Sequence, residues 1–557
     1  MSKTPLAQAV ALATLGASLT LPTLGYAAFL EDSKASLEAR NFYFNRDFRQ
    51  EGGSSSGQSK VEEWAQGFIL RAESGFTDGT VGFGADAIGM FGFKLDSGDG
   101  TAGSGLLVPD RSSGGSQDNY SGLAVAAKAK ISKSTLRVGG MQFKNQAIAS
   151  SDSRLLPQVF QAGHLVSQEI DGLTLDMGHV REVNGRNSND YEDIALTTGG
   201  RRGITTTGGT TTDSFSFFGG NYKITKDLTA GYYHSKLEDM YKQNSFSLVH
   251  VLPLADKQTL KTDLRYARST DDSRSNIDNK ALGAMVTYGL DGHAFGLGYQ
   301  KMSGDTGFAY INGTDPFLVN YVQIGDFANK DEKSWQARYD YDFAALGVPG
   351  LTSTLRYISG NNVDTGKGYE GKDRERDLDI GYVLQSGSLK GLGIRVRNAM
   401  ARSTRASGAL SPGTTAAKAC AGDTPGSVSS CRSANCQTGR KRSISCMRAT
   451  APQASRPSSR YSMSAFCACI LFSASSHTTL CGPSITSALT SSPRCAGRQC
   501  MNKASGLATA IMASFTHHCA KAARRTSFSA SKPMLVHTSV VTRSAPAQAS
   551  RGSLNTL

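Results

Sequence analysis

The stretch LDIGYVLQSGSLKGLGIRVRNA, at residues 378–399, decides the class of fold. Apolar side chains occupy every second position over residues 378–384 and again over residues 392–396. Gly and Ser cluster between these runs, at residues 386–391. The pattern predicts two β-strands joined by a turn.

Two arginines alternate with the apolar residues of the second run. Arg395 and Arg397 therefore share one face of the strand, roughly 7 Å apart. In a dry core, two unpaired guanidiniums would cost several kcal/mol. That face is either solvated sheet surface or the wall of a water-filled pore whose aliphatic side faces lipid.

Two unlike sequences meet near residue 403. The net charge of the 557-residue chain is +14, yet residues 1–403 hold 42 basic and 45 acidic groups. Residues 404–557 hold 18 basic groups, one acid (Asp423) and all ten cysteines. We expect no nucleic-acid partner, because the basic tail has hardly any aromatic side chains for base stacking.

The chain divides into three expected segments. Residues 1–27 read as a secretory signal peptide, with an Ala/Leu run at residues 6–24 and small residues at the cleavage site. A permanent membrane anchor is the alternative, although the run is short and rich in Ala and Thr. Residues 28–403 form the exported part, which has no cysteine and therefore no disulfides. Residues 404–557 form a basic, Cys- and Ser-rich tail.

The exported part is predicted to consist of successive β-strands. Clear alternation over about ten residues occurs at residues 80–96, 335–343 and 351–357. Membrane β-strands have this length, whereas soluble sandwich strands are shorter. Tight connections are expected at residues 77–79, 225–227 and 290–292, and long polar loops at 97–120, 183–213, 303–333 and 359–377. Short turns at one end and long loops at the other are typical of outer-membrane barrels.

A strand with half of its connections takes roughly 22 residues, so residues 28–403 supply about 17 strands. Bacterial single-chain barrels have an even number of strands. The exported part is therefore expected to be one strand short of a closed ring.

Seven segments, in order, carry a resemblance to a known family. They are NFYFNRD (41–47), ESGFTDGTVGFG (73–84), SRLLPQ (153–158), LEDMY (237–241), KSWQARYD (333–340), GVPGL (347–351) and RVR (395–397). Residues 29–403 resemble the OprD-like family of substrate-specific outer-membrane porins. The resemblance implies an 18-stranded transmembrane antiparallel β-barrel with inward loops, in which a ladder of Arg and Lys faces an acidic loop and guides small carboxylate-bearing solutes.

The tail departs from that family pattern. The family continues after Arg397 into a final strand, whereas residues from Thr404 onward lose acids and alternation and gain cysteines. A shifted reading frame explains these changes together, and a genuine Cys-rich domain is the alternative. Cys467, Cys469 and the pair at 517–518 lack zinc-site spacing, so we expect no metal. Without a closing strand, the chain is expected to be exported, to fail to insert stably and to be degraded.

The candidate pore-lining residues are charges that could form a constriction. Arg395 and Arg397 are supported by both spacing and resemblance, while Arg154, Arg46 and Lys60 match family ladder positions and could instead be solvated rim charges. Asp315 matches the acidic side of the family constriction, or is an ordinary acid of a polar loop. A row of arginines offers a carboxylate successive bidentate contacts that water makes reversible.

The resemblance implies passive, selective uptake of small carboxylate-bearing solutes (amino acids, peptides or aromatic acids) across the outer membrane. A structural or adhesive barrel is the alternative. No catalytic motif is present, so we expect no enzyme and no cofactor. The expected partners are outer-membrane lipid, the solutes and the outer-membrane assembly machinery, with the chain a monomer or weak trimer.

Overall fold

The computed structural model describes residues 26–48, 58–110, 112–199, 201–364 and 368–404, together with the backbone of residues 460–474. All of these residues belong to one compact unit. A short helix, α2 (Tyr26–Glu31), precedes the first strand, and a 3-10 helix, η1 (Phe343–Leu346), lies between two later ones. No helix in the described ranges is long and apolar enough to cross a membrane. The expected signal peptide lies outside the described residues, apart from the first two residues of α2.

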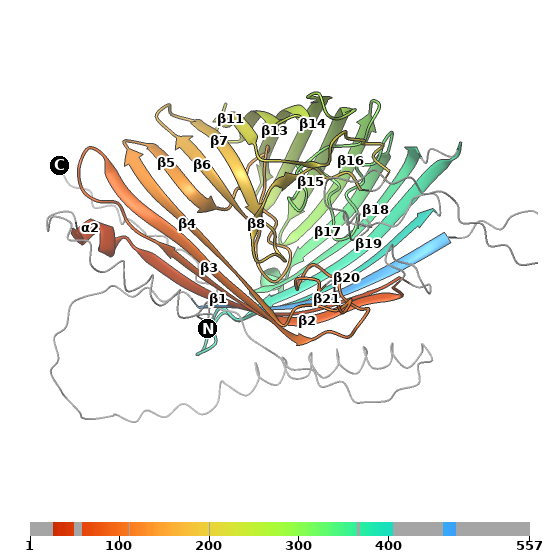
Figure 1. Ribbon diagram of the computed structural model, residues 1–557, viewed down its shortest axis with the longest axis horizontal. Coiled ribbons are helices and arrows are strands. Elements are labelled where there is room, and N and C mark those ends of the chain that lie inside the picture. Colours follow the sequence, from red (N-terminus) through yellow and green to blue (C-terminus); the bar gives the residue numbers. More distant parts are fainter. Residues whose placement is uncertain are drawn as a thin grey trace, which may run out of the picture. The chain divides into compact units, whose positions relative to one another are not determined.

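The strands form one antiparallel barrel (Figure 1). The sheet in the described ranges has 19 strands. The two-residue β8 (Tyr191–Glu192) pairs only with the end of β7, and the other 18 strands follow one another around a ring. A separate small sheet pairs β9 (Ile194–Ala195) with β10 (Thr211–Thr212). The ring strands are β1 (Lys34–Asp47), β2 (Lys60–Glu73), β3 (Gly82–Asp96), β4 (Asn119–Ile131), β5 (Ser134–Met141), β6 (Val159–Ser167), β7 (Leu173–Asn184), β11 (Phe215–Lys223), β12 (Leu228–Leu237), β13 (Tyr241–Ala255), β14 (Gln258–Asp271), β15 (Asp278–Leu290), β16 (His293–Ser303), β17 (Lys333–Asp342), β18 (Leu351–Asp364), β19 (Glu370–Val383), β20 (Gly393–Thr404) and β21 (Arg460–Ala474).

The two faces of the ring differ as the alternation predicts. Along β2, Val61, Glu63 and Ala65 are buried toward the interior, while the intervening side chains are more exposed. Large apolar side chains cover the outer face, among them Leu297, which is 70% exposed. An apolar outer band over a polar interior is the arrangement of a barrel that spans lipid.

The hairpin predicted at residues 378–399 is confirmed, because β19 ends at Val383 and β20 begins at Gly393. The prediction of a long loop at residues 359–377 is wrong. There β18 continues to Asp364 and β19 begins at Glu370. Both faces of β19 are charged at this end, so its alternation of bases and acids looked like a polar loop.

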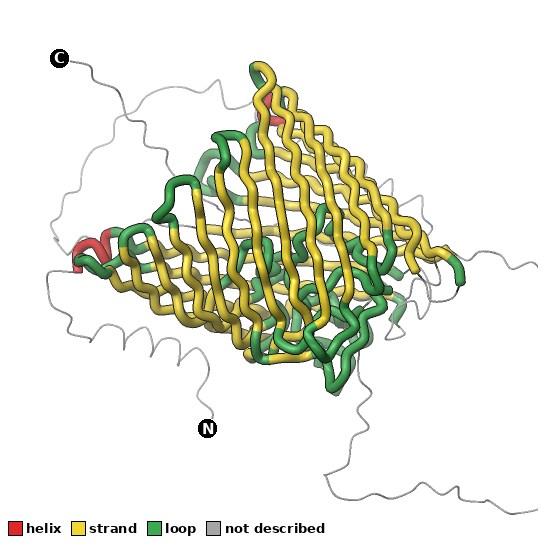
Figure 2. Tube along the Cα trace, turned by 90° about the horizontal axis from the view of Figure 1, so that it is seen from above, coloured by secondary structure: helices red, strands yellow, loops and turns green. Residues whose placement is uncertain are grey.

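Long connections fold into the ring, where Figure 2 shows loops lying among the strands. The loop at residues 142–158 places Leu155 and Leu156 against the interior face of β1 and β2, beside Phe44. Gly67 makes this approach possible, since a Cβ on it would lie 2.9 Å from the Leu155 Cγ. The loops thus narrow the barrel from within.

The inward loops also bind one another. The Thr197 amide donates to the Tyr310 carbonyl over 2.9 Å, and Leu196 forms a β-bridge with Ile311. The Asp315 amide donates to the Ala149 carbonyl over 3.0 Å. Backbone contacts therefore hold the loops at 142–158, 185–214 and 304–332 together.

The strand expected to be missing is supplied by the tail. β21 pairs with β20 over Gly393–Thr404 and with β1 over residues 37–47, which closes the ring. Its sequence has apolar residues at both parities from 465 to 472, so it lacks the alternation by which strands were sought. The geometric reason for expecting failed insertion is therefore removed.

Ending the chain after Thr404 should destroy the barrel, because β1 and β20 would each expose a row of unpaired backbone groups to lipid. Cell fractionation followed by a heat-modifiability gel compares the truncated chain with the full-length chain. We expect a protease-resistant, heat-modifiable outer-membrane species from the full-length chain alone. The same species from the truncated chain would show that β21 is dispensable.

Candidate pore constriction

Charged side chains gather on the interior face of strands β17–β20. We name this group the wall cluster: Arg338, Arg356, Asp377, Asp379, Arg395 and Arg397. The antiparallel register places Arg338 opposite Arg356, and Arg356 opposite Asp377. The same register pairs Asp379 with Arg397. Four arginines thus lie on neighbouring strands of one wall.

Asp379 joins the two arginines of β20. Its carboxylate accepts from Arg395 Nε over 2.8 Å, from an Arg395 terminal nitrogen over 2.6 Å, and from Arg397 Nε over 3.0 Å. The Asp379 side chain is only 8% exposed, whereas that of Arg395 is 43% exposed. The carboxylate is therefore held at the wall while the arginine remains open to the lumen.

A second charged group surrounds the inward loops. We name it the loop cluster: Arg40, Arg46, Asp152, Arg154, Arg186 and Asp315. The guanidinium carbons of Arg46 and Arg154 lie 5.5 and 5.2 Å from the centre of the Phe44 ring. Arg154 Nε also donates to the Ser104 carbonyl over 2.9 Å. The Phe44 side chain thus lies beside both Arg46 of β1 and Arg154 of the loop at 142–158, and the hydrogen bond to Ser104 also holds Arg154.

The other two cations of the loop cluster are held differently, since Arg186 donates to the hydroxyls of Ser151 and Ser153, each over 3.2 Å. Arg40 on β1 binds Asp152 in a bidentate arrangement, at 2.5 and 3.0 Å. Asp315 accepts a bond of 3.1 Å from the Tyr321 hydroxyl. Burial raises the pKa of Asp315 above its ordinary value, while hydrogen bonds and the Arg186 charge partly oppose this shift. The loop cluster therefore contains both signs of charge.

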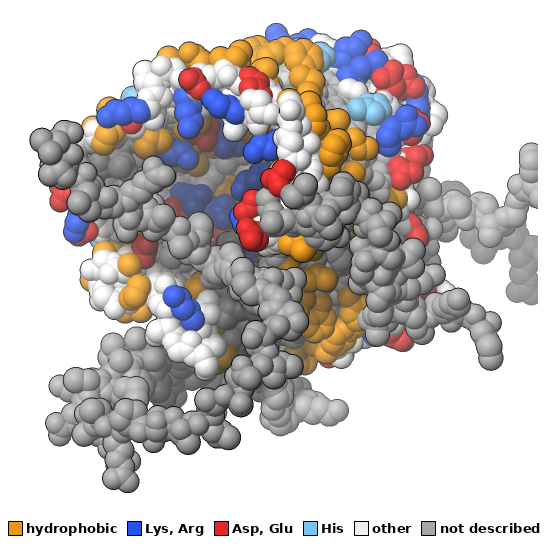
Figure 3. All heavy atoms as spheres, turned by 90° about the vertical axis from the view of Figure 1, so that its left-hand side faces the viewer, with side chains coloured by type: hydrophobic (Ala, Val, Ile, Leu, Met, Phe, Trp, Pro, Cys, Tyr) orange, Lys and Arg blue, Asp and Glu red, His pale blue; other side chains and the backbone are white. Residues whose placement is uncertain are grey.

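The strand that carries Arg397 of the wall cluster and the strand that carries Phe44 beside the loop cluster are separated only by β21. Arg397 is the register partner of Cys467 in β21, and Cys467 is the partner of Phe44 in β1. Two strand spacings, about 10 Å, therefore separate the Arg397 and Phe44 backbones. Figure 3 shows a hollow in the molecule with Lys and Arg side chains on its walls.

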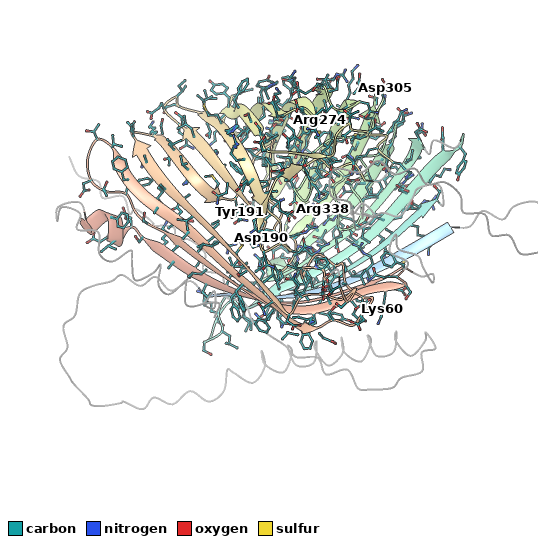
Figure 4. All side chains as sticks on the ribbon, viewed as in Figure 1. Lys60, Asp190, Tyr191, Arg274, Asp305 and Arg338 are labelled. Atoms are coloured by element: carbon teal, nitrogen blue, oxygen red, sulfur yellow. The ribbon has the colours of Figure 1, made fainter. Side chains whose placement is uncertain are left out.

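Five of the six predicted residues belong to one or the other of the two clusters. Arg395 and Arg397 belong to the wall cluster, and Arg46, Arg154 and Asp315 belong to the loop cluster. Lys60 stands apart, at the first residue of β2 (Figure 4). It has the outward parity of Phe68 and Leu70, and its ammonium binds Glu62 over 2.6 Å. This position fits the alternative of a rim charge.

Several members of both clusters were not predicted. Asp379 lies in the run KDRERDLD, whose acids at every second position could have indicated a charged interior row. Arg338 binds Asp340 two residues along β17, at 2.6 and 2.8 Å, and Figure 4 shows it among the strands of the barrel. Arg40 and Asp152 are 112 residues apart in the chain. Only the folded inward loop reveals their contact.

A closed ring of long strands with an apolar outer face and a charged, loop-narrowed interior defines a channel of the outer-membrane porin class. The sequence profile of the family described as "outer membrane porin, OprD family" matches residues 27–411. The chain belongs to this family of outer-membrane porins. Its members are channels, and they reside in the outer membrane.

Relatives support this assignment over most of their length. The chain is 40% identical to Porin D of Pseudomonas aeruginosa over 399 residues, covering 67% of this chain and 87% of that protein. It is 37% identical to the porin-like protein GalP of Pseudomonas putida, covering 70% and 91%. The crystal structure of Pseudomonas aeruginosa OpdQ is similar with a TM-score of 0.65 and 49% identity, covering 80% of this chain and 99% of that one.

Replacing Asp379 by Asn should raise the preference of the channel for anions. The substitution removes the carboxylate that Arg395 and Arg397 share, so more positive charge faces the lumen. Reversal potentials across a salt gradient measure this change in planar bilayers. Asp171→Asn, in an exposed turn, is the matched control. An unchanged reversal potential in Asp379→Asn would contradict the assigned role of the wall cluster.

The pH dependence of selectivity should report Asp315. Because burial raises its pKa, Asp315 loses its charge at a higher pH than an ordinary aspartate. As pH falls through that raised pKa, a negative charge leaves the loop cluster and anion preference should rise. Asp315→Asn should lack this step in a pH series of reversal potentials. A step of equal size in the variant would assign it to another group.

Proposed function

We propose that this porin passes small carboxylate-bearing solutes through a constriction formed by the wall cluster and the loop cluster. The observation that carries the proposal is the sharing of one carboxylate, Asp379, between Arg395 and Arg397. A site that already satisfies two guanidiniums with a carboxylate has the geometry to accept a carboxylate from a solute.

The proposed path uses exchange of partners. A solute carboxylate approaches Arg395, the more exposed arginine of the pair, whose side chain is 43% exposed against 24% for Arg397. It binds there in competition with Asp379. When the solute leaves, Asp379 again occupies both arginines, so neither charge remains unpaired. Such competition keeps binding weak enough for passage, as conduction requires.

The loop cluster would set the selectivity of the same passage. Arg46 and Arg154 lie against Phe44 and supply positive charge, whereas Asp315 supplies negative charge from the loop at residues 304–332. A solute with a carboxylate and an ammonium can satisfy both signs. We therefore include amino acids and peptides, together with aromatic acids, in the proposed solute class. Lys60, which is bound to Glu62 on the outward parity, contributes to the outer rim rather than to this passage.

The alternative of a structural or adhesive barrel would need long external loops. In this chain, three long loops fold inward instead and place charged side chains in the lumen. That arrangement favours transport over adhesion.

Replacing Arg395 and Arg397 by Ala should weaken block of the channel current by an amino acid about tenfold, because charge-assisted hydrogen bonds to its carboxylate are lost. Anion preference should also fall, and more at low salt, where screening is weak. Single-channel recordings in planar bilayers measure both. Arg374→Ala with Arg376→Ala, on the outward face of β19, removes the same charge outside the lumen and is the control.

The same amino acid with its carboxylate converted to an amide should block the unaltered channel weakly. Block that is equal for acid and amide, or unchanged in the double variant, would remove the two arginines from the mechanism. A barrel without saturable solute flux would support the structural or adhesive alternative.

A further inference from the structure

Basic side chains also occupy the outward face of the barrel, at the end where the long loops emerge. We name these residues the rim cations: Lys301, Lys333, Lys372, Arg374, Arg376 and Arg402. Their strands place them on the outward parity, which Leu297, Trp335 and Leu378 share. They therefore face the surroundings of the barrel and not its lumen.

Two pairs of rim cations lie directly opposite each other in the sheet. The register pairs Lys301 with Lys333, and Arg374 with Arg402. Like charges directly opposite on one face of a sheet repel each other. Among the described residues, no acid forms an ion pair with any of these four, although Asp331, Asp364 and Glu370 line the same groove as the lysine pair. The repulsion is therefore not relieved by a salt bridge within the described ranges.

The rim cations lie just beyond an aromatic and apolar band. Tyr299 and Trp335 are register partners, exposed by 44% and 47%, and Lys301 and Lys333 follow two residues farther toward the long loops. On β19 the apolar Leu378 is followed toward the same end by Arg376 and then Arg374. Exposed aromatic side chains mark the interface between hydrocarbon and headgroups. The rim cations therefore reach the headgroup level.

The position of the long loops identifies the membrane leaflet that the rim cations face. Outer-membrane barrels carry their longer loops at the external end and short turns at the periplasmic end. The connections at residues 97–118, 185–214 and 304–332 emerge at the end where the rim cations lie, whereas β4–β5 and β13–β14 are joined by two-residue turns at the other end. The rim cations therefore face the external leaflet.

We propose that the rim cations bind the phosphate groups of the phosphorylated glycolipid in the external leaflet. Clustered Lys and Arg at a membrane surface bind anionic lipid headgroups. A phosphate lying across Arg374 and Arg402, or across Lys301 and Lys333, would accept from both partners and relieve their repulsion. The guanidinium pair is the stronger site, since its planar donors match phosphate in a bidentate manner and no outward acid lies beside it on β19 from Lys372 to Leu378.

The test uses the full chain in detergent with phosphorylated lipopolysaccharide as the probe. Binding is measured by fluorescence titration at low and high salt. Replacing Arg374 and Arg402 by Gln should weaken affinity about fivefold for each charge removed, and the Lys301→Gln, Lys333→Gln variant should weaken it less. Lys226→Gln with Lys257→Gln, exposed lysines in turns at the opposite end, should leave affinity unchanged.

Two further binding measurements use the unaltered chain. Dephosphorylated lipopolysaccharide should bind the unaltered chain more weakly, and added inorganic phosphate should compete only at far higher concentration than the lipid. Equal affinity for both lipids would overturn the proposal, as would equal loss in the rim and control variants. Association of copies that the rim variants abolish, without any effect of lipid, would assign this surface to oligomerisation instead.

Discussion

Closure of the ring is the constraint on which the rest of this molecule depends. Within lipid, every backbone N–H and C=O must be paired, and an open sheet edge would leave a row unpaired. In this chain the edges of β1 and β20 are both covered by β21, whose partners include Tyr43 in β1 and Val396 in β20. A segment from the basic tail thus takes the position that completes the eighteenth strand of the wall.

A closed wall determines where charge can reside. Outward positions in the middle of the strands are apolar, as at Leu297 and Leu355, so the arginines of the strands either face the lumen or lie at the rim. Inside, Asp379 and Phe44 each bring two arginines close together, one through hydrogen bonds and the other through its ring. The inward loops narrow the lumen beside these side chains. The hydrogen-bonded wall that closes the barrel therefore also determines the positions of the charged side chains at the constriction.

Many of the strands, and the faces on which their side chains lie, could be predicted from the alternation of apolar and polar residues alone. Period-two patterning located strands such as β3 and β17 and placed Arg395 and Arg397 on one face. It failed where both faces of a strand have the same character. The start of β19 is charged on both faces, and residues 465–472 are apolar at both parities, so neither showed a strand signal. Contacts between distant segments, such as Arg40 with Asp152, have no local signal at all. The outward position of Lys60 depends on the register of β2, which the family resemblance alone did not fix.

Closure of the barrel depends on the register between β1 and β21, and cross-linking measures that register. In a chain whose ten native cysteines are replaced by Ser, Tyr43→Cys would be combined with Ala468→Cys, its register partner. Such partners are within disulfide distance. The offset combination Tyr43→Cys with Ser464→Cys is the control, since Ser464 pairs with Asp47, four residues or about 13 Å away along the strand. If β21 closes the barrel in this register, an internal disulfide forms in the first protein from outer-membrane fractions and none forms in the second. No cross-link in either protein, or equal cross-linking in both, would contradict closure by β21.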